Sequence, residues 1–162
     1  RRKKDYIRSK KKVMISNFSK IYRRFIVNEI HVDSDDVVGL VEKIDIKGIG
    51  EVDAKIDSGN GAYNVIDGEV ISKRGDNIII KTIGGKKLKK KVVDQVVIHI
   101  GSGNKELRPV VAFDIKLGDE EYNDVPFSIA DRSENEYAVL VGKIFLSKID
   151  KLIDVDKQYE QD

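Results

Sequence analysis

The sequence predicts an all-β domain, a barrel or a sandwich, with one short C-terminal helix and a basic amphipathic helix in front of it. Short apolar runs fill residues 37–156, and Gly, Asn, Asp or Pro interrupts them about every 8–12 residues, a spacing typical of such folds. In several runs apolar and polar residues alternate, which indicates strands with one buried face.

The chain divides into a basic arm (1–12), an amphipathic helix with a linker (13–36), the β domain (37–156) and a tail (157–162). Residues 1–30 hold 11 Lys and Arg against two acidic residues, a net charge of +9. Because the whole chain has a net charge of +2, the remainder carries −7. This asymmetry indicates a basic arm on a mildly acidic domain.

The arm is expected to be disordered in isolation, because it is a block of like charges with almost no apolar residue. It is either a solvated tail or a contact for nucleic acid, an acidic protein or an acidic membrane surface. The apolar residues in 18–26 recur at helical spacing and predict one apolar face. Lys20, Arg23 and Arg24 lie off that face and are candidate partner-binding residues. The apolar face is expected to pack on its own domain or on a partner subunit, with a membrane surface as the alternative.

The β domain is expected to contain strands over 37–46, 51–57, 63–70, 77–83, 92–100, 107–117 and 124–130. Five lysines crowd into residues 86–91, directly after Gly84 and Gly85. They predict either a solvated hairpin tip or a mobile loop that contacts a negatively charged partner. A helix over 144–151 and a last strand over 152–155 complete the domain.

Several chemistries are excluded or poorly supported. The chain has no Cys, which removes disulfides, thiol catalysis and Cys-based zinc sites. Its two histidines, His31 and His99, have no paired spacing for a zinc site or a Ser-His triad. Residues 101–105 fail the spacing of a phosphate-binding loop, and 31–36 fail that of a calcium loop. We therefore expect no metal and no cofactor. No apolar run approaches the length of a membrane span, and no signal-peptide core is seen.

One carboxylate stands out, that of Asp57. Val52, Ala54 and Ile56 alternate with polar residues and predict a strand that ends at Asp57, with Ser58 and Gly59 after it. This places an acidic side chain at the mouth of a rigid element. Asp, Ser and Gly are also ordinary turn formers, so the triplet alone fits a plain turn as well.

A second stretch changes this interpretation. An apolar strand over 137–141 ends in Gly142-Lys143 and opens a helix. Together with Asp57-Ser58-Gly59, it resembles the retropepsin-like aspartic proteases, in which a strand ending Asp-Thr/Ser-Gly carries the catalytic Asp. The closest similarity is to the bacterial branch labelled "ATP-dependent zinc protease". The resemblance spans 37–156 and keeps the order of the motifs, which here are Val92-Val93-Asp94, Leu107-Arg108-Pro109-Val110-Val111, Asp131-Arg132-Ser133 and Val141-Gly142-Lys143.

The resemblance implies a closed retropepsin-like β-barrel that supplies one catalytic Asp, Asp57, per chain. A homodimer would then be needed to form an Asp dyad that hydrolyses peptide or protein substrates at mildly acidic to neutral pH. It also implies that Ser58 braces the loops across the dimer and that Gly59 lets the backbone approach the substrate. The flap candidate is Gly84, Gly85 and Lys86. The zinc of the branch label has no support in this sequence.

Two positions depart from the family pattern. Asn60 stands where the family usually has Ala, and a polar side chain there is expected to disturb the loop beside the dyad. Lys143 replaces the commoner Arg, which removes a planar forked donor.

Two other functions stay open from the sequence. The first is a catalytically silent structural module of a larger assembly, for example a virus particle, docked through the basic arm and helix. The second is nucleic-acid binding through the arm and the lysines of 86–91. The corresponding locations are the cytoplasm or the interior of a virus particle.

Overall fold

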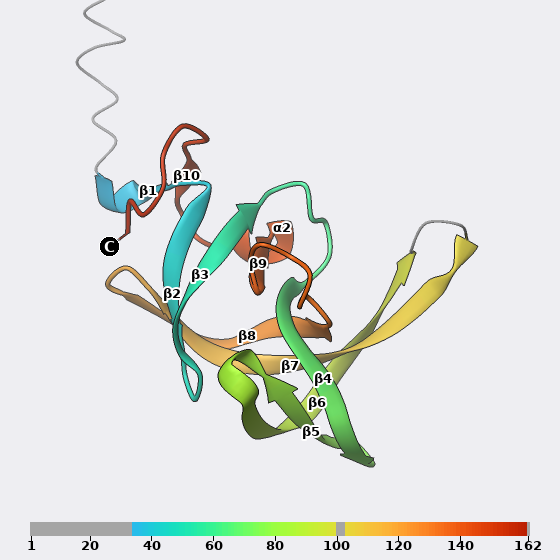
Figure 1. Cartoon of the computed structure of the whole chain (residues 1–162). Coiled ribbons are helices and arrows are strands. Elements are labelled where there is room, and N and C mark those ends of the chain that lie inside the picture. The colour runs from blue at the N-terminus through green and yellow to red at the C-terminus, as the bar shows by residue number, and fades with distance from the viewer. Residues whose placement is uncertain (1–33, 100–102, 162) are drawn as a thin grey trace, which may run out of the picture. The chain divides into compact units, whose positions relative to one another are not determined.

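A computed structural model describes residues 34–99 and 103–161. These residues form a mostly β fold with a one-turn α-helix near the end of the chain (Figure 1). The strands are β1 (Val37–Val38), β2 (Val41–Ile46), β3 (Gly50–Asp57), β4 (Asn64–Arg74), β5 (Asn77–Thr82), β6 (Lys86–His99), β7 (Lys105–Leu117), β8 (Glu120–Ala130), β9 (Val139–Gly142) and β10 (Leu152–Ile153). The helical elements are η1 (Ser34–Asp36), η2 (Ile83–Gly85) and α2 (Lys143–Leu146).

Eight strands form one hydrogen-bonded sheet in the order β2-β3-β9-β4-β5-β6-β7-β8. Additional pairings of β2 with β7 and of β4 with β8 close the strands into a ring, while β1 pairs with β10 separately. The predicted fold class is therefore confirmed, including the short helix near the C-terminal end. The predicted arm and amphipathic helix lie outside the described residues. No helix in the described part of the chain is long and apolar enough to cross a membrane.

Alternating apolar residues build the core inside this ring. In β5 the side chains of Ile78, Ile80 and Thr82 are buried, and those between them are exposed. Phe113 of β7 and Phe127 of β8 meet edge to face, with ring centroids 5.7 Å apart. Each fully buried side chain of this size contributes about 1.5–3 kcal/mol, so burial of the alternating residues holds the ring closed.

Strand β9 lies between β3 and β4, parallel to the first and antiparallel to the second. The register places Asp57, the last residue of β3, beside Gly142, the last residue of β9. A Cβ at Gly142 would lie only 3.0–3.2 Å from atoms of Asn60 and Ala62. Glycine therefore favours the close approach of the loop that follows β3, because any Cβ would push its neighbours back.

Two predicted elements differ from the structure. The lysines of 86–91 lie in β6, paired with β5, and not in a turn. The strand tolerates them because Leu88 and Lys90 share its half-buried face, where Lys90 Nζ donates to the Ala112 carbonyl oxygen at 2.8 Å and lies 3.8 Å from the Phe113 ring centroid. The helix is also shorter than predicted. It spans Lys143–Leu146, whereas the sequence predicted a helix over 144–151.

The C-terminal residues are fixed by a buried carboxylate. Glu42 of β2 is fully buried and accepts hydrogen bonds from the backbone N–H groups of Gly39 (2.5 Å), Glu160 (3.1 Å) and Gln161 (3.1 Å). Burial of a charge is costly unless it is hydrogen-bonded in this way. A Cβ at Gly39 would lie 2.5 Å from the Lys157 carbonyl oxygen, so the same segment also requires that glycine.

Candidate active site

Asp57 is half-buried at the carboxyl end of β3. Ser58 and Gly59 follow it in an exposed turn, and the Asn60 N–H donates to the Asp57 carbonyl oxygen at 3.1 Å. A Cβ at Gly59 would lie 3.4 Å from Asp57 Oδ1, so the carboxylate is directed toward this turn. The strand therefore presents one acid at its end, as the alternating pattern predicted.

The side chain of Asn60 stabilises the turn that it was expected to disturb. Its Oδ1 accepts the Ala62 N–H at 3.1 Å, and its Nδ2 donates to the Tyr63 carbonyl oxygen at 3.2 Å. Its own carbonyl oxygen accepts the N–H of Lys143 at 2.8 Å. The polar group is thus satisfied within the loop, which is why the family's Ala is not required here.

Asn64 holds the next part of the site together. It is almost completely buried, and its Oδ1 accepts the Gly142 N–H at 2.8 Å. Its carbonyl oxygen accepts the hydroxyl of Ser128 at 3.2 Å. The beginning of β4 is therefore tied to both β9 and β8. The sequence analysis missed this residue, because a single Asn at the start of an apolar run carries no distinguishing pattern.

The Val92-Val93-Asp94 motif reaches the same loop from another strand. Tyr63 Oη donates to Asp94 Oδ2 at 2.5 Å. This hydrogen bond lowers the pKa of the Asp94 carboxyl, and the Gln95 N–H, which donates to Asp94 Oδ1 at 2.7 Å, lowers it further. The same bond raises the pKa of the Tyr63 hydroxyl. The contact therefore favours an ionised Asp94 and a protonated Tyr63.

The two arginines of the remaining motifs lie on different elements. Arg132 donates its backbone N–H to Asp67 Oδ1 at 2.7 Å and its Nε to the Tyr137 carbonyl oxygen at 2.8 Å. Burial is the main cause of a lowered Arg132 pKa, and the cation of Arg108 lowers it further. The carboxylates of Asp67 and Asp57 act in the opposite direction. Arg132 is therefore within electrostatic range of both Arg108 and Asp57.

The three flap candidates lie elsewhere. Gly84 and Gly85 form a tight turn with φ angles of 67° and 71°, and Lys86 Nζ donates to the Ile49 carbonyl oxygen. Ile49 precedes β3, whereas Asp57 ends it. Gly84, Gly85 and Lys86 are thus near the end of β3 opposite their own chain's Asp57.

The other predicted site residues, Lys20, Arg23 and Arg24, lie outside the described residues. Within residues 34–99 and 103–161, no group of three or more acidic or histidine side chains is arranged to hold a metal ion. The expectation that the protein uses neither a metal nor a cofactor stays a prediction.

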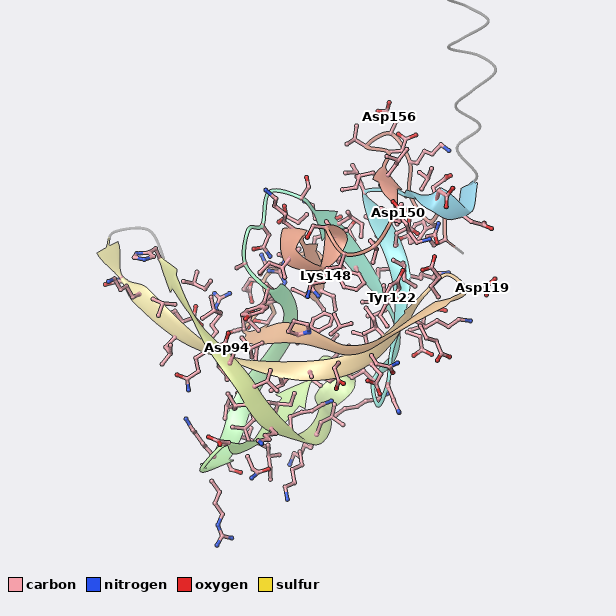
Figure 2. All side chains as sticks on the ribbon, turned by 180° about the vertical axis from the view of Figure 1, so that it is seen from behind. Asp94, Asp119, Tyr122, Lys148, Asp150 and Asp156 are labelled. Carbon is pink, nitrogen blue, oxygen red and sulfur yellow. The ribbon has the colours of Figure 1, made fainter. Side chains whose placement is uncertain are left out.

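A cavity of about 290 Å³ lies between β8 and α2. Tyr63, Tyr122, Phe145 and Lys148 are among the residues that line it, and Asp57 is not. Figure 2 shows Tyr122 and Lys148 on this side of the molecule, with Asp94 well separated from them. The cavity therefore borders the end of the loop that follows Asp57 without reaching Asp57 itself.

Comparison with known proteins identifies a family on the larger part of the chain. The sequence model of the RimB-like family, described as the retropepsin-like aspartic endopeptidase RimB, matches residues 67–162. The match includes Asp94, Arg108 and Arg132 and begins ten residues after Asp57. A search of curated proteins found no match.

One solved structure shares the fold. It is a protein of unknown function from Legionella pneumophila subsp. pneumophila strain Philadelphia 1, described as DUF785. The two chains are 24% identical with a TM-score of 0.62, and the alignment covers 79% of this chain and 99% of the other. At this identity the similarity supports the arrangement of the strands and says nothing of the chemistry.

Proposed function

The chain belongs to the RimB-like family of retropepsin-like aspartic endopeptidases, and from that premise we propose that it hydrolyses peptide bonds with Asp57 as the catalytic residue. The observation that carries the proposal is the position of Asp57. It is half-buried at the end of β3, beside the Gly142-Lys143 junction where β9 passes into α2. A strand end held by packing on both sides can fix a carboxylate while leaving it open to a substrate.

One carboxylate per chain is not sufficient for this chemistry, so we propose that two chains each supply Asp57. Two carboxylates about 3 Å apart cannot both be ionised, and they share one proton. The ionised group then acts as the general base on a water molecule, and the protonated group donates a hydrogen bond to the scissile carbonyl oxygen. Ser58 would brace the two turns against each other, and Gly59 would leave room for the substrate backbone.

The long β6–β7 hairpin replaces Gly84–Lys86 as our flap candidate. Its β6 strand carries Asp94, which contacts Tyr63 in the loop after Asp57. Figure 1 shows the outer part of this hairpin reaching away from the rest of the described fold. A projecting hairpin tied to the loop that follows Asp57 is better placed to cover a bound peptide than a turn near Ile49 at the other end of β3.

The substitution Asp57→Asn tests the proposal. Cleavage of a peptide library should fall by about 10²–10⁴-fold, because an amide cannot serve as the general base. Asp53→Asn is the matched control, because it makes the same change at an exposed position of the same strand and should leave cleavage unchanged. Equal cleavage by wild type and Asp57→Asn would contradict the proposal.

Mixing the two proteins tests the dimer within the same experiment. If each site needs two Asp57 carboxylates and the chains exchange freely, an equal mixture retains about one quarter of the wild-type activity at the same total concentration. An activity of about one half would mean that each chain works alone.

The silent structural module remains the alternative, with the basic arm as its docking element. The residues that would dock it, including Lys20, Arg23 and Arg24, lie outside the described residues, and no observation on residues 34–99 and 103–161 favours it. Nucleic-acid binding through the same arm likewise depends on residues that lie outside the described part of the chain. An inactive wild-type protein whose incorporation into an assembly depends on residues 1–30 would support the module over the peptidase.

A further inference from the structure

An unbroken series of hydrogen bonds joins Asp57 to the β6–β7 hairpin. The first bond runs from the Asn60 N–H to the Asp57 carbonyl oxygen at 3.1 Å. The next two tie the Asn60 side chain to the Ala62 N–H (3.1 Å) and to the Tyr63 carbonyl oxygen (3.2 Å). The last runs from Tyr63 Oη to Asp94 Oδ2 at 2.5 Å. Each bond involves the loop of residues 57–63, so the hairpin and the acid are held by the same short segment.

Asp94 lies where the hairpin leaves the body of the sheet. β6 pairs with β5 only from Lys86 to Lys91, and beyond Val92 its ladder partner is β7. The β6–β7 register shifts between Val92 and Asp94, which marks a bulge, and the Gln95 N–H fixes Asp94 Oδ1 at 2.7 Å. A bulge redirects a side chain and bends its strand. The Tyr63–Asp94 bond thus holds the outer hairpin at its base.

The hydrogen bond between Tyr63 and Asp94 also determines which face of the hairpin is directed toward the loop of residues 57–63. Successive side chains of a strand point to opposite faces, so Asp94, Val96 and Ile98 share one face. Val96 and Ile98 are half-buried, whereas Val97 and its cross-strand partner Leu107 on the other face are 50% and 60% exposed. Because Asp94 meets Tyr63, the face with Val96 and Ile98 is the one turned toward the Asp57 loop.

We propose that Asn60, Tyr63 and Asp94 are positioning residues that couple the β6–β7 hairpin to the Asp57 loop. This inference rests on the proposed peptidase function. It adds the requirement that the hairpin be held at a fixed position relative to the Asp57 loop. A substrate bound between the hairpin and Asp57 contacts two elements whose spacing is set by one tyrosine hydroxyl. Loss of that hydroxyl leaves the acid in place and loosens the surface that holds the peptide.

The test removes the hydroxyl and keeps the ring, in the full-length protein. Tyr63→Phe should raise KM for a peptide substrate about tenfold and leave kcat within about twofold, because substrate binding is weakened and the acid is unchanged. Backbone amides of residues 94–99, 105–108 and 110 should exchange with deuterium at least several-fold faster. The double variant Tyr63→Phe/Asp94→Ala should show no larger effect on KM than the more affected single variant, since the two side chains act through one contact.

Tyr122→Phe is the matched control. Tyr122 Oη also donates to a carboxylate oxygen, that of Glu120 at 2.7 Å, and its ring packs edge to face on Phe145. Tyr122 lines the same cavity as Tyr63, but its hydroxyl bonds to neither the Asp57 loop nor the hairpin, and Figure 2 shows it apart from Asp94. This variant should change neither KM nor exchange in the hairpin. Equal behaviour of Tyr63→Phe and Tyr122→Phe in both measurements would overturn the inference.

The two proposals fail in different ways. If Asp57→Asn abolishes cleavage but Tyr63→Phe changes neither KM nor hairpin exchange, only the coupling is wrong. If the wild-type protein cleaves no peptide, the peptidase proposal fails, and hydrogen exchange alone decides the coupling. Faster exchange confined to the hairpin supports it, and unchanged exchange overturns it.

Discussion

Two carboxylates on neighbouring strands of this fold have opposite surroundings. Glu42 of β2 is fully buried, and three backbone N–H groups surround it. Asp57 of β3 is half-buried at a strand end, next to exposed Ser58 and Gly59. A carboxylate saturated with fixed donors contributes to stability, and a carboxylate at an open strand end can still take a proton or contact a substrate. Burial and the number of hydrogen-bond donors therefore distinguish Glu42 from Asp57, the acid that we propose as catalytic.

The largest effect on stability should come from removing the buried acid. Glu42→Ala leaves the N–H groups of Gly39, Glu160 and Gln161 without an acceptor, and should lower the free energy of unfolding by about 3 kcal/mol. Chemical denaturation measures it, with Asp57→Asn as the comparison, for which the change should be below about 1 kcal/mol. If both variants lose the same stability, the distinction between the two acids does not hold.

A smaller effect is expected from Gly142→Ala, which alters the surroundings of Asp57 without touching its carboxylate. The added Cβ would lie 3.0–3.2 Å from Asn60 and Ala62 atoms, and the shift needed to accept it should cost about 2 kcal/mol. Peptide cleavage should fall as well, because the turn after Asp57 must move. Gly61→Ala is the control, since a Cβ there has no neighbour within 4 Å. Cleavage that survives in Gly142→Ala would show that the turn tolerates displacement.

The smallest effect should come from a third kind of acid, Asp114, which is half-buried and paired with a lysine at the surface. Its carboxylate accepts Lys47 Nζ at 3.0 Å and the Asp124 N–H at 3.1 Å, and the bond from Lys47 is the main cause of its lowered pKa. A lowered folded-state pKa stabilises the protein above the unfolded pKa of about 3.9, and this contribution is lost as pH falls through the folded value.

Asp114→Asn should therefore move the thermal midpoint only slightly at neutral pH and flatten its decline below about pH 4. Added salt should weaken the contribution of the pair in the wild-type protein, since both side chains are accessible to solvent. A loss of stability equal to that of Glu42→Ala would mean that exposure does not distinguish these acids.

The sequence predicted the parts of the fold that local pattern controls. Alternation in 51–57 and 77–83 gave strands that the structure confirms, because burial of one face imposes a period of two. The lysines of 86–91 were assigned to a turn because charge density suggests solvent. In the structure these lysines lie in a strand that pairs with β5 and exposes most of its side chains, so they reach solvent there as they would in a turn.

The site could be predicted only in part. The position of Asp57 at a strand end follows from local pattern, because the strand and the turn after it each have one, and its role as the catalytic residue stays a prediction. The bond between Tyr63 and Asp94 joins residues 31 positions apart, and nothing in either neighbourhood indicates the other. The role of Asn60 was misjudged for the same reason, since its value depends on donors and acceptors that only the folded loop brings within reach.

The anchoring of the last residues by Glu42 has a practical consequence for anyone who handles this protein. An affinity handle fused behind residue 162 would extend from backbone that is already pinned to β2. Trimming the chain back to residue 156 would instead remove two of the three backbone donors to the Glu42 side chain. Residues 160 and 161 are thus part of the interior packing around Glu42, and removing them changes the core.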